Sequence, residues 1–325
     1  MTMRISIAMA TYNGEKYLQE QLDSFLNQTR LPDELVVSDD CSTDSTMQIL
    51  HDFAKNAPFE VKIYQNEHNL GYARNFENAL KLTSGDIIFL SDQDDIWFSE
   101  KIEFIINFAQ QNTEYLLYMN DAEICLADGN STKLTQLGQI LSLGFSEKEF
   151  PTGCCMAIRR HLKYLALPIP KFHAHDTWLN RLSNILEVKK VIPSVLQLYR
   201  RHGENTSNWI ASRIKKQTPF DLIIHKLKYN GDPSLELDQL NSELDALAAI
   251  IDSPLITDSM REKINREISR VKVKKLIRRK RLKIQAMPHI YRIRYVIKLL
   301  ASGHYKYYSG WQSAIKDLFF LKLIS

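Results

Sequence analysis

The stretch Asp86–Asp95, DIIFLSDQDD, places a short apolar run directly before three carboxylates. Its Ile-Ile-Phe-Leu run predicts a buried strand of a parallel sheet. Asp92, Asp94 and Asp95 follow within four residues, and Ile96-Trp97 return the chain to apolar character, so the acids lie between two segments that we expect to be buried. A strand that ends in a cluster of acids is typical of a ligand site at the carboxyl edge of an α/β sheet.

The sequence before this stretch alternates strand and helix patterns. Each of three earlier apolar runs is followed by a helical periodicity: Ile5–Ala10, Leu35–Val37 and Val61–Tyr64. This alternation predicts an α/β fold with a mostly parallel sheet flanked by helices. The polar runs Thr11–Asn13 and Asp39-Asp40 follow the first two strands, so we expect them at the same edge of the sheet as the acids.

The chain has 325 residues, of which 44% are hydrophobic and 25% charged, an ordinary globular composition. At ~150 residues per domain, this length favours about two domains. Strand patterns stop near residue 215, and the leucine spacing after it is helical. We therefore predict an α/β domain at 1–215 and a helical C-terminal region at 216–325.

The sequence also bears on location. No uncharged apolar run approaches the ~18–20 residues that span a bilayer. Cys41, Cys125, Cys154 and Cys155 show no CxxC spacing, so we expect reduced thiols in a cytoplasmic protein. The last two cysteines follow Gly153 in an apolar context and are interpreted as small buried hydrophobic residues.

Charge is distributed unevenly along the chain. Residues 261–298 hold fifteen Lys or Arg and two acids, a local balance of +13. Because the whole chain carries +4, the rest of it carries −9. Aliphatic and aromatic residues interleave with Arg292, Arg294 and Lys298, as in an amphipathic element on an anionic membrane surface. The alternatives are a solvated helix face and a contact between copies in a homo-oligomer.

The three acids after the strand need a positive partner, because like charges at this spacing repel. A divalent cation such as Mg²⁺ or Mn²⁺, held by one or two carboxylates and by substrate phosphates, is the simplest candidate. The alternative is a solvated acidic turn. The residues alone leave open which of Asp92, Asp94 and Asp95 binds the metal.

Two further side chains have two interpretations each. Asp40 either caps the following helix or accepts a hydrogen bond from the ring N–H of a nucleobase. Arg74 is either a solvated helix charge or a ligand of a diphosphate at the start of its helix.

Taken with their neighbours, these residues resemble the family 2 glycosyltransferases, inverting enzymes of the GT-A fold with a DxD-type metal motif. The resemblance covers about residues 3–210 and is greatest to bacterial polysaccharide-assembly members, including rhamnosyl- and glucosyltransferases. The motifs that carry it are ATYNG at 10–14, QT at 28–29, VSDDCSTD at 37–44, NLG at 69–71, RN at 74–75, SDQDDIW at 91–97, TGC at 152–154, HD at 175–176 and YRRH at 199–202.

The resemblance implies a role for each matching position. Asp176 matches the catalytic base, and Asp94 matches the ligand of a Mn²⁺ or Mg²⁺ ion that bridges the donor's diphosphate. The implied nucleotide-sugar site comprises Ala10, Tyr12, Asn13, Asp40, Arg74, Asp92 and Gly153. The sequence departs from the family pattern at Asp95, an extra acid, and at His175, where many members have Glu.

Other residues near these motifs have less specific signals. His202 either completes the metal or diphosphate site, with Arg200 or Arg201 on the phosphates, or is an ordinary packing residue. Trp178 is predicted to form an aromatic platform for the acceptor sugar beside Asp176, whose own alternative is a helix cap. Asp121 either faces the acceptor or holds a turn.

The sequence thus predicts a metal-dependent inverting glycosyltransferase that uses a UDP- or dTDP-sugar, such as dTDP-rhamnose. The resemblance implies a saccharide acceptor linked to polyprenyl diphosphate in O-antigen or capsule assembly. It therefore implies a peripheral protein on the inner face of the cytoplasmic membrane, docked through residues 261–300.

Two alternatives compete with this function. A metal-dependent nucleotidyltransferase would usually need a Gly-rich or basic phosphate loop, and residues 10–14 contain no Lys or Arg. A nucleic-acid-binding module could use the basic segment, but the acidic remainder of the chain repels a phosphate backbone, so we expect no nucleic-acid partner.

Overall fold

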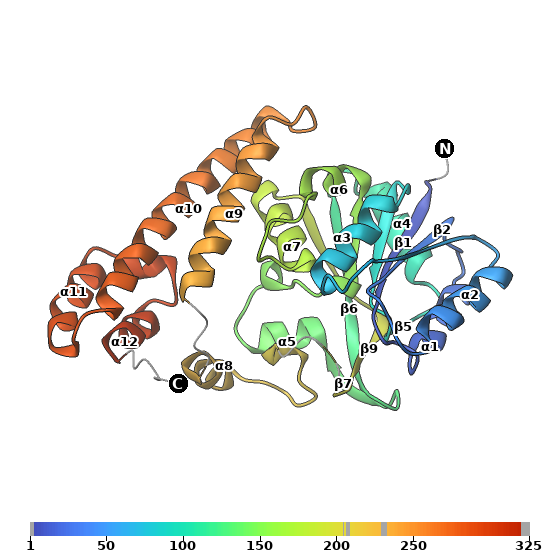
Figure 1. Cartoon of the computed structure of the whole chain (residues 1–325), viewed down its shortest axis with the longest axis horizontal. Helices are drawn as coiled ribbons and strands as arrows, with labels where there is room; N and C mark the ends of the chain where they lie inside the picture. Colours follow the sequence, from blue (N-terminus) through green and yellow to red (C-terminus); the bar gives the residue numbers. More distant parts are fainter. Residues whose placement is uncertain (1–2, 204, 206–208, 229–232, 320–325) are drawn as a thin grey trace. The chain divides into compact units, whose positions relative to one another are not determined.

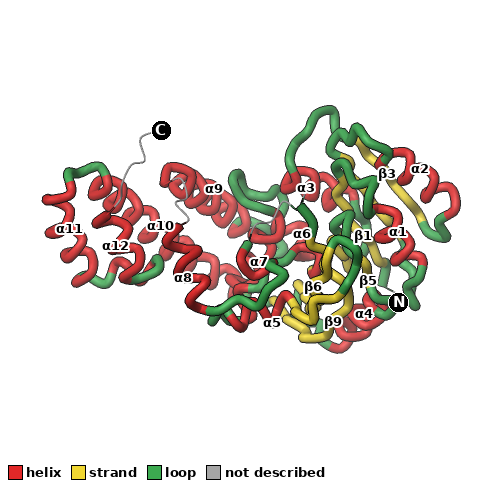
Figure 2. The backbone as a smooth tube through the Cα atoms, turned by 90° about the horizontal axis from the view of Figure 1, so that it is seen from below, coloured by secondary structure: helices red, strands yellow, loops and turns green. Residues whose placement is uncertain are grey.

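The chain forms two compact units. The first comprises Met1–Ile169 and His173–Leu222, and the second comprises Pro170–Phe172 and Ile223–Ser325. The computed structural model describes residues 3–203, 205, 209–228 and 233–319. Strands occur in the first unit, and the described residues of the second unit form helices and turns (Figure 2).

The first half of the sheet is parallel, as predicted. Its strands pair in the order β3-β2-β1-β4. Their bounds are β1 (Ile5–Thr11), β2 (Glu34–Asp39), β3 (Glu60–Gln65) and β4 (Ile87–Ser91). The connecting helices are α1 (Leu18–Leu26), α2 (Thr46–Asn56) and α3 (Tyr72–Leu82). β2 and β4 are buried along their whole length, which explains their continuous apolar runs.

The second half of the sheet mixes strand directions. β4 pairs antiparallel with β8 (Met156–Arg159), which pairs antiparallel with β6 (Leu117–Leu126). β6 pairs parallel with β9 (Lys189–Arg201) and antiparallel with β7 (Ser131–Thr135), and β5 (Ile96–Trp97) pairs antiparallel with β9. The prediction of a mostly parallel sheet therefore describes β1–β4, whereas in the second half the β6–β9 pair is parallel and the other pairs are antiparallel. β6 and β7 are joined by a short hairpin rather than by a crossover helix.

Helices of the first unit cover this sheet (Figure 1). Their bounds are α4 (Lys101–Gln111), α5 (Gln136–Ser142), α6 (Arg160–Ala166) and α7 (His175–Leu186), and short 3₁₀ turns lie at Glu147–Glu149, Gly153–Cys155 and Ile210–Ser212. One large core cluster joins apolar side chains of β1, β2 and β4 to α1 and α4 through Phe25, Phe89 and Trp97. The aromatic ring of Trp97 thereby anchors the chain directly after the acidic segment.

The C-terminal region is helical, as predicted. α8 (Pro219–Lys228) contains the division between the units, and the second unit holds α9 (Pro233–Ile251), α10 (Asp258–Gln285), α11 (His289–Ala301), a 3₁₀ turn (His304–Tyr307) and α12 (Trp311–Phe319). The Thr257 side chain caps α10 by accepting from the Met260 N–H. A small core gathers around Tyr305 and Val296.

A buried ionic cluster fixes the end of α10 against α12. The Arg281 guanidinium donates to both carboxylate oxygens of Asp317 at 2.7 and 3.0 Å, and the Tyr305 hydroxyl donates to the same carboxylate at 2.8 Å. Among the described residues, no helix combines the length and the apolar character needed to cross a membrane.

Candidate active site

The acidic segment lies at the carboxyl end of β4, beside the 3₁₀ turn that contains Cys154. Asp95 is buried and Asp92 partly buried, and one ligand atom from each of Asp92, Asp95 and Cys154 lies within 4.8 Å of the others. Cys154 was not predicted to belong to this cluster, because its apolar neighbours in the sequence indicated an ordinary core residue.

The electrostatics of this cluster show excess negative charge. Burial, together with the neighbouring carboxylates, raises the pKa of Asp92 well above its usual range and that of Asp95 to about 7. The ammonium of Lys101 lies buried nearby, donating to the Cys154 carbonyl at 3.0 Å and to the Gln197 side chain. Burial in turn lowers the pKa of Lys101 to about 8. A divalent cation would supply the charge that Lys101 does not, and carboxylate oxygens suit Mg²⁺ or Mn²⁺.

Asp94 points to a second group of polar side chains. Its Oδ2 lies 2.7 Å from the Nε2 of His202 and accepts from the Asn205 amide at 3.0 Å. The His202 ring packs at 4.7 Å, between centroids, from the ring of Tyr17. The structure therefore brings together the two residues that the sequence predicted as metal ligands, although they are 108 positions apart in the chain.

Arg200 holds the acidic segment in place. Its buried guanidinium donates to the Asp94 carbonyl at 2.9 Å and to the Ala127 carbonyl at 2.8 Å, and it pairs with Glu20 at 2.7 Å. Its backbone N–H donates to Asp95 at 3.2 Å. The alternative that placed Arg200 on the donor's phosphates is therefore wrong, because strand alternation along β9 turns this side chain inward.

Gln93 joins the acidic segment to the loop after β1. Its amide accepts from the Tyr12 N–H at 2.9 Å and donates to the Tyr12 carbonyl at 3.0 Å. A Cβ at Gly14 would lie 2.4 Å from the end of the Gln93 side chain, so a larger residue here would displace Gln93 from these bonds. The clamp fixes the Tyr12 backbone next to the end of Ala10's strand while the tyrosine side chain stays 49% exposed. No local sequence pattern indicates this role for the residue between Asp92 and Asp94.

The loop after β2 is tied to the same region. The Asn13 N–H donates to the Ser42 hydroxyl at 2.9 Å. The buried Asp40 carboxylate accepts from the Asn66 amide at 2.9 Å and from the N–H groups of Leu70 and Gly71 at 2.8 Å each. Asp40 therefore holds the backbone just before α3 rather than capping the following helix, α2, whose N-cap residue is Ser45. Its contact with a nucleobase stays a prediction.

Arg74 lies on the first turn of α3. Its guanidinium pairs with Glu77 and donates to the Ile169 carbonyl at 2.7 Å. The side chain is about a third exposed, at 34%. A guanidinium has five N–H donors, so these two interactions do not use all of them. Contact of Arg74 with a diphosphate therefore stays a prediction.

Asp176 lies in the first turn of α7, next to the acidic cluster. Its charge contributes to the raised pKa of Asp92, and its Oδ1 accepts from the N–H of Thr177 at 2.6 Å. A Cβ at Gly153 would lie 3.3 Å from the Cβ of Asp176 and 3.0 Å from Nε2 of His175, which explains the glycine here. The buried His175 ring stacks on Phe76 at 3.9 Å between centroids.

The two residues predicted to contact the acceptor, Trp178 and Asp121, are both buried. Trp178 is fully buried, and its indole N–H donates to the Ala166 carbonyl at 2.9 Å, so it offers no face to a sugar and the platform prediction is wrong. Asp121 is also buried, and its Oδ1 accepts from the N–H groups of Ala122 and Leu137 at 2.7 and 2.9 Å. It holds the start of α5 in place, which corresponds to the turn role rather than to the acceptor role.

The basic segment of the second unit divides into paired and exposed charges. Arg278 lies buried 3.0 Å from Glu236, and Arg281 is engaged by Asp317. The exposed basic residues of α10 include Lys272, Arg279, Lys280 and Lys283. On α11 a basic residue is buried and an apolar one is exposed. Arg292 is buried against the Met287 and Gln285 carbonyls, while Ile290 is 77% exposed. The apolar residues exposed beside it are Tyr291, Ile293, Tyr295, Ile297 and Leu300.

Comparison with known proteins identifies the family. The family described as "Glycosyl transferase family 2" matches residues 6–162. A protein of Haemophilus influenzae named as an uncharacterized glycosyltransferase is 31% identical over 191 residues, which are 58% of this chain and 74% of that protein. The chain belongs to glycosyl transferase family 2.

Two further comparisons place this family 2 protein among its relatives. A dTDP-rhamnosyl transferase of Shigella flexneri is 40% identical over 103 residues, so the chain spans about a third of that relative, 36% of its length. The crystal structure of S. aureus TarS 1–349 in complex with UDP-GlcNAc aligns over 97% of this chain and 89% of that chain, with 18% identity and a TM-score of 0.59. That likeness supports the GT-A fold and extends over the helical region.

Proposed function

We propose that this family 2 protein is a metal-dependent inverting glycosyltransferase that uses a UDP- or dTDP-sugar. The observation that carries the proposal is the cluster of partly compensated acids at the carboxyl ends of the parallel strands. Tyr12 is clamped beside it by Gln93, and Asp176 lies next to Asp92. The names of the two relatives, a dTDP-rhamnosyl transferase and TarS with UDP-GlcNAc, support a pyrimidine nucleotide donor.

The metal site would be formed by Asp94 and His202, with Asp92 and Asp95 beside them. A bound Mn²⁺ or Mg²⁺ would stabilise the negative charge that develops on the nucleotide diphosphate as it leaves. The chain's own task is to orient these ligands. Arg200 holds the Asp94 backbone and Asn205 holds its carboxylate, so Asp94 is oriented before the donor binds.

Asp176 would act as the general base. The acceptor hydroxyl is a poor nucleophile until a carboxylate takes its proton, which contributes ~10²–10⁴-fold in rate. One base on the face opposite the leaving group gives a single displacement with inversion at the anomeric carbon, as in inverting hydrolases. Asp176 lies in the first turn of α7, at the positive end of the helix dipole.

The acceptor is proposed to be a saccharide on a polyprenyl diphosphate, in surface polysaccharide assembly at the cytoplasmic face of the membrane. The exposed Ile290, Tyr291 and Ile293 of α11 alternate with Arg294 and Lys298, which suits contact with an anionic lipid surface. Only the exposed cations of α10 contribute, since Arg278 and Arg281 are engaged within the unit.

The donor can be tested by thermal shift of the purified chain with UDP, dTDP and GDP, with and without Mn²⁺. We expect stabilisation by a pyrimidine diphosphate that depends on Mn²⁺, followed by slow hydrolysis of the matching sugar donor in a panel of UDP-Glc, UDP-Gal, UDP-GlcNAc, UDP-GalNAc and dTDP-rhamnose. Absence of stabilisation by both UDP and dTDP would overturn the proposal. A nucleotidyltransferase would instead release pyrophosphate from a nucleoside triphosphate.

Membrane docking can be tested by sedimentation with liposomes. The wild-type chain should bind phosphatidylglycerol liposomes at low salt and lose most of that binding at high salt, because surface charge is screened. Changing Ile290 and Ile293 to Ser should weaken binding, whereas the matched change of the exposed Leu141 in the first unit should not. Equal sedimentation with neutral and anionic liposomes, or with neither, would contradict docking through α11.

A further inference from the structure

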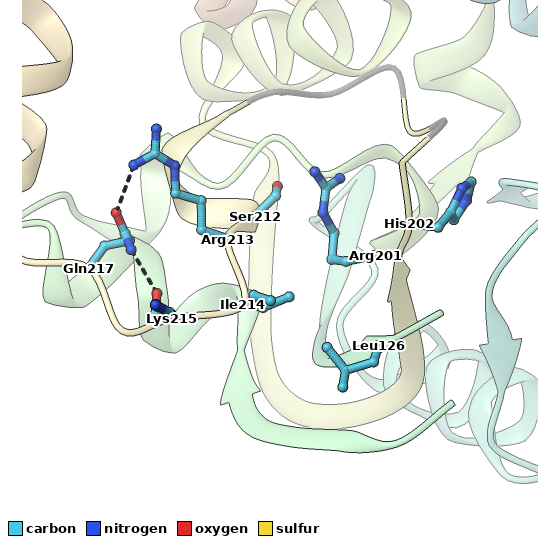
Figure 3. A pocket seen from close by; sticks show the side chains of 8 residues that line it. All are labelled: Leu126, Arg201, His202, Ser212, Arg213, Ile214, Lys215 and Gln217. Carbon is cyan, nitrogen blue, oxygen red and sulfur yellow. Dashed lines mark hydrogen bonds between the residues drawn. The ribbon is translucent and has the colours of Figure 1, made fainter. Parts of the chain in front are cut away.

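A basic cavity lies beside the candidate metal site and shares the residue His202 with it. It has a volume of about 450 Å³. Its walls come from the ends of β6 and β9 and from the segment that follows the 3₁₀ turn Ile210–Ser212 (Figure 3). The lining residues are Leu126, Arg201, His202, Ser212, Arg213, Ile214, Lys215 and Gln217.

The chemistry of this lining favours an anion with an apolar neighbour. Arg201, Arg213 and Lys215 contribute three positive charges, and the eight lining residues, all within the described part of the chain, include no carboxylate. Leu126 and Ile214 supply apolar surface between them. Arginine and lysine together are the usual recognition groups for phosphate oxygens. The volume falls in the range of ordinary small-molecule sites, ~300–1,000 Å³.

The cationic wall is held by a buried side chain rather than left as a loose loop. The Gln139 amide, buried in α5, donates to the Arg213 and Lys215 carbonyls at 2.9 and 2.8 Å. Its oxygen accepts from the Gln217 N–H at 3.0 Å. The Ser142 hydroxyl donates to the Gln217 carbonyl at 3.0 Å. These bonds fix the backbone that carries both exposed cations, so the charges are gathered before a ligand arrives.

The position of the cavity separates it from the nucleotide end of the site. Tyr12 and Asp40 follow β1 and β2, whereas the cavity lies at β6 and β9, and β4 and β8 stand between β1 and β6 in the sheet. Three strand spacings of ~4.8 Å put roughly 14 Å between these edges. His202 joins the two regions, since it lines the cavity and lies 2.7 Å from Asp94.

We propose that this cavity binds the phosphate or diphosphate ester of the acceptor, next to the donor's metal site. The proposal rests on the proposed glycosyltransferase function. The anionic ester would lie against Arg201, Arg213 and Lys215, with its first apolar carbons against Leu126 and Ile214. An acceptor held by its phosphate would keep its sugar near Asp94 and the transferring centre, which gives the chain a means of selecting phosphorylated acceptors over neutral sugars.

The test is isothermal titration of the full chain in EDTA with farnesyl diphosphate, inorganic pyrophosphate and farnesol, so that the metal site contributes nothing. Wild-type protein should bind farnesyl diphosphate and not farnesol. The double variant Arg213→Gln, Lys215→Gln should bind it at least tenfold more weakly, and the matched variant of the exposed neighbour, Lys216→Gln, should bind within twofold of wild type. Tighter binding of farnesyl diphosphate than of pyrophosphate assigns the ester to a lipid, and equal binding assigns it to a soluble phosphate.

A second titration separates this proposal from the proposed function. UDP with Mn²⁺ should bind the double variant as tightly as wild type. If the double variant loses UDP affinity by the same factor, the cavity belongs to the donor's diphosphate and the proposal is overturned. It is equally overturned if farnesyl diphosphate and pyrophosphate both fail to bind wild type, or bind both variants alike. Failure of UDP to bind any form, with farnesyl diphosphate binding intact, would instead contradict the glycosyltransferase function alone.

Discussion

Buried carboxylates occur at both ends of the parallel strands, but the hydrogen-bond donors and charges around them differ between the two ends. Glu34 begins β2, whereas Asp92 and Asp95 follow the end of β4. The Glu34 carboxylate is fully buried and receives the Lys62 ammonium at 2.7 Å, the Ser6 hydroxyl at 2.5 Å and the Ser84 hydroxyl at 2.9 Å. Burial raises its pKa, but these donors outweigh burial and lower the pKa to about 2.

At the other end the balance is reversed. Burial and the proximity of like charges dominate at Asp92 and Asp95, so their pKa values are raised. This contrast distinguishes an acid that stabilises the fold from acids placed at a ligand-binding edge. The chain supplies its own cations and hydroxyls to Glu34, and it leaves the carboxyl-end acids partly uncompensated where a ligand edge is expected. We therefore propose that the acidic cluster is a functional site, because its negative charge is only partly compensated by the chain.

The largest expected effect concerns Asp176. Asp176→Asn should lower kcat by ~10²–10⁴-fold, because the amide cannot accept the acceptor's proton. The affinity for donor and metal should stay near that of wild type, since Asp176 lies beside the metal cluster rather than in it. Steady-state kinetics with Mn²⁺-dependent UDP binding as the control measure this. Loss of donor affinity and turnover by the same factor would assign Asp176 a structural role.

Asp94→Asn should act on the metal. The amide loses the charge that offsets the cation, so Mn²⁺-dependent UDP binding should weaken by ~10–100-fold together with turnover. The fold should be unchanged, because the Asn amide can still contact His202. A Mn²⁺ titration of the UDP affinity measures this effect, and a variant with wild-type metal dependence would show that Asp94 is not a ligand.

Glu34→Gln should act on stability and leave the site alone. The folded carboxylate has a pKa of about 2 against an ordinary value of 4.5, so its ionisation contributes on the order of 3 kcal/mol to the free energy of unfolding at neutral pH. A lowered pKa gives stability that is complete above the unfolded value and is lost as pH falls from 4.5 toward 2. Urea unfolding should therefore show a gap between wild type and variant that closes in this window. A gap that persists unchanged at pH 2 would contradict the pKa difference.

The smallest effect expected is that of Trp178→Phe. It removes the hydrogen bond to the Ala166 carbonyl and should cost ~1–3 kcal/mol of stability. The acceptor KM should stay within twofold of wild type, because the buried ring contacts no substrate. A large rise in the acceptor KM with unchanged stability would restore the sugar-platform role.

Much of the first half of the fold could be predicted from the sequence, because β1, β2 and β4 contain buried apolar runs and an amphipathic helix follows each of β1, β2 and β3. The second half could not. β9 contains Lys189, Pro193 and Arg200 among its residues, so it lacks an apolar run. Its pairing with β6 depends on contacts far apart in the sequence. The same strand carries Arg200 inward, which no local pattern could reveal.

Site residues that belong to sequence motifs could be predicted, whereas those whose position depends on tertiary packing could not. Asp94 and His202, which the motifs single out, lie 2.7 Å apart, and their role as metal ligands stays a prediction. The buried Lys101, the Gln93 clamp and the Gln139 support of the basic cavity each depend on a partner 53 to 81 positions away. Trp178 was predicted wrongly because residue type beside Asp176 cannot tell which face of α7 is buried.

We propose that the acids after β4 bind a divalent cation together with the nucleotide. A Mn²⁺ titration followed by electron paramagnetic resonance, with and without UDP, tests this directly. We expect one Mn²⁺ to bind per wild-type chain, more tightly when UDP is present. Binding should be weaker in Asp94→Asn and unchanged in Glu34→Gln. UDP binding of equal strength in EDTA, or Mn²⁺ binding that is the same in all three forms, would contradict it.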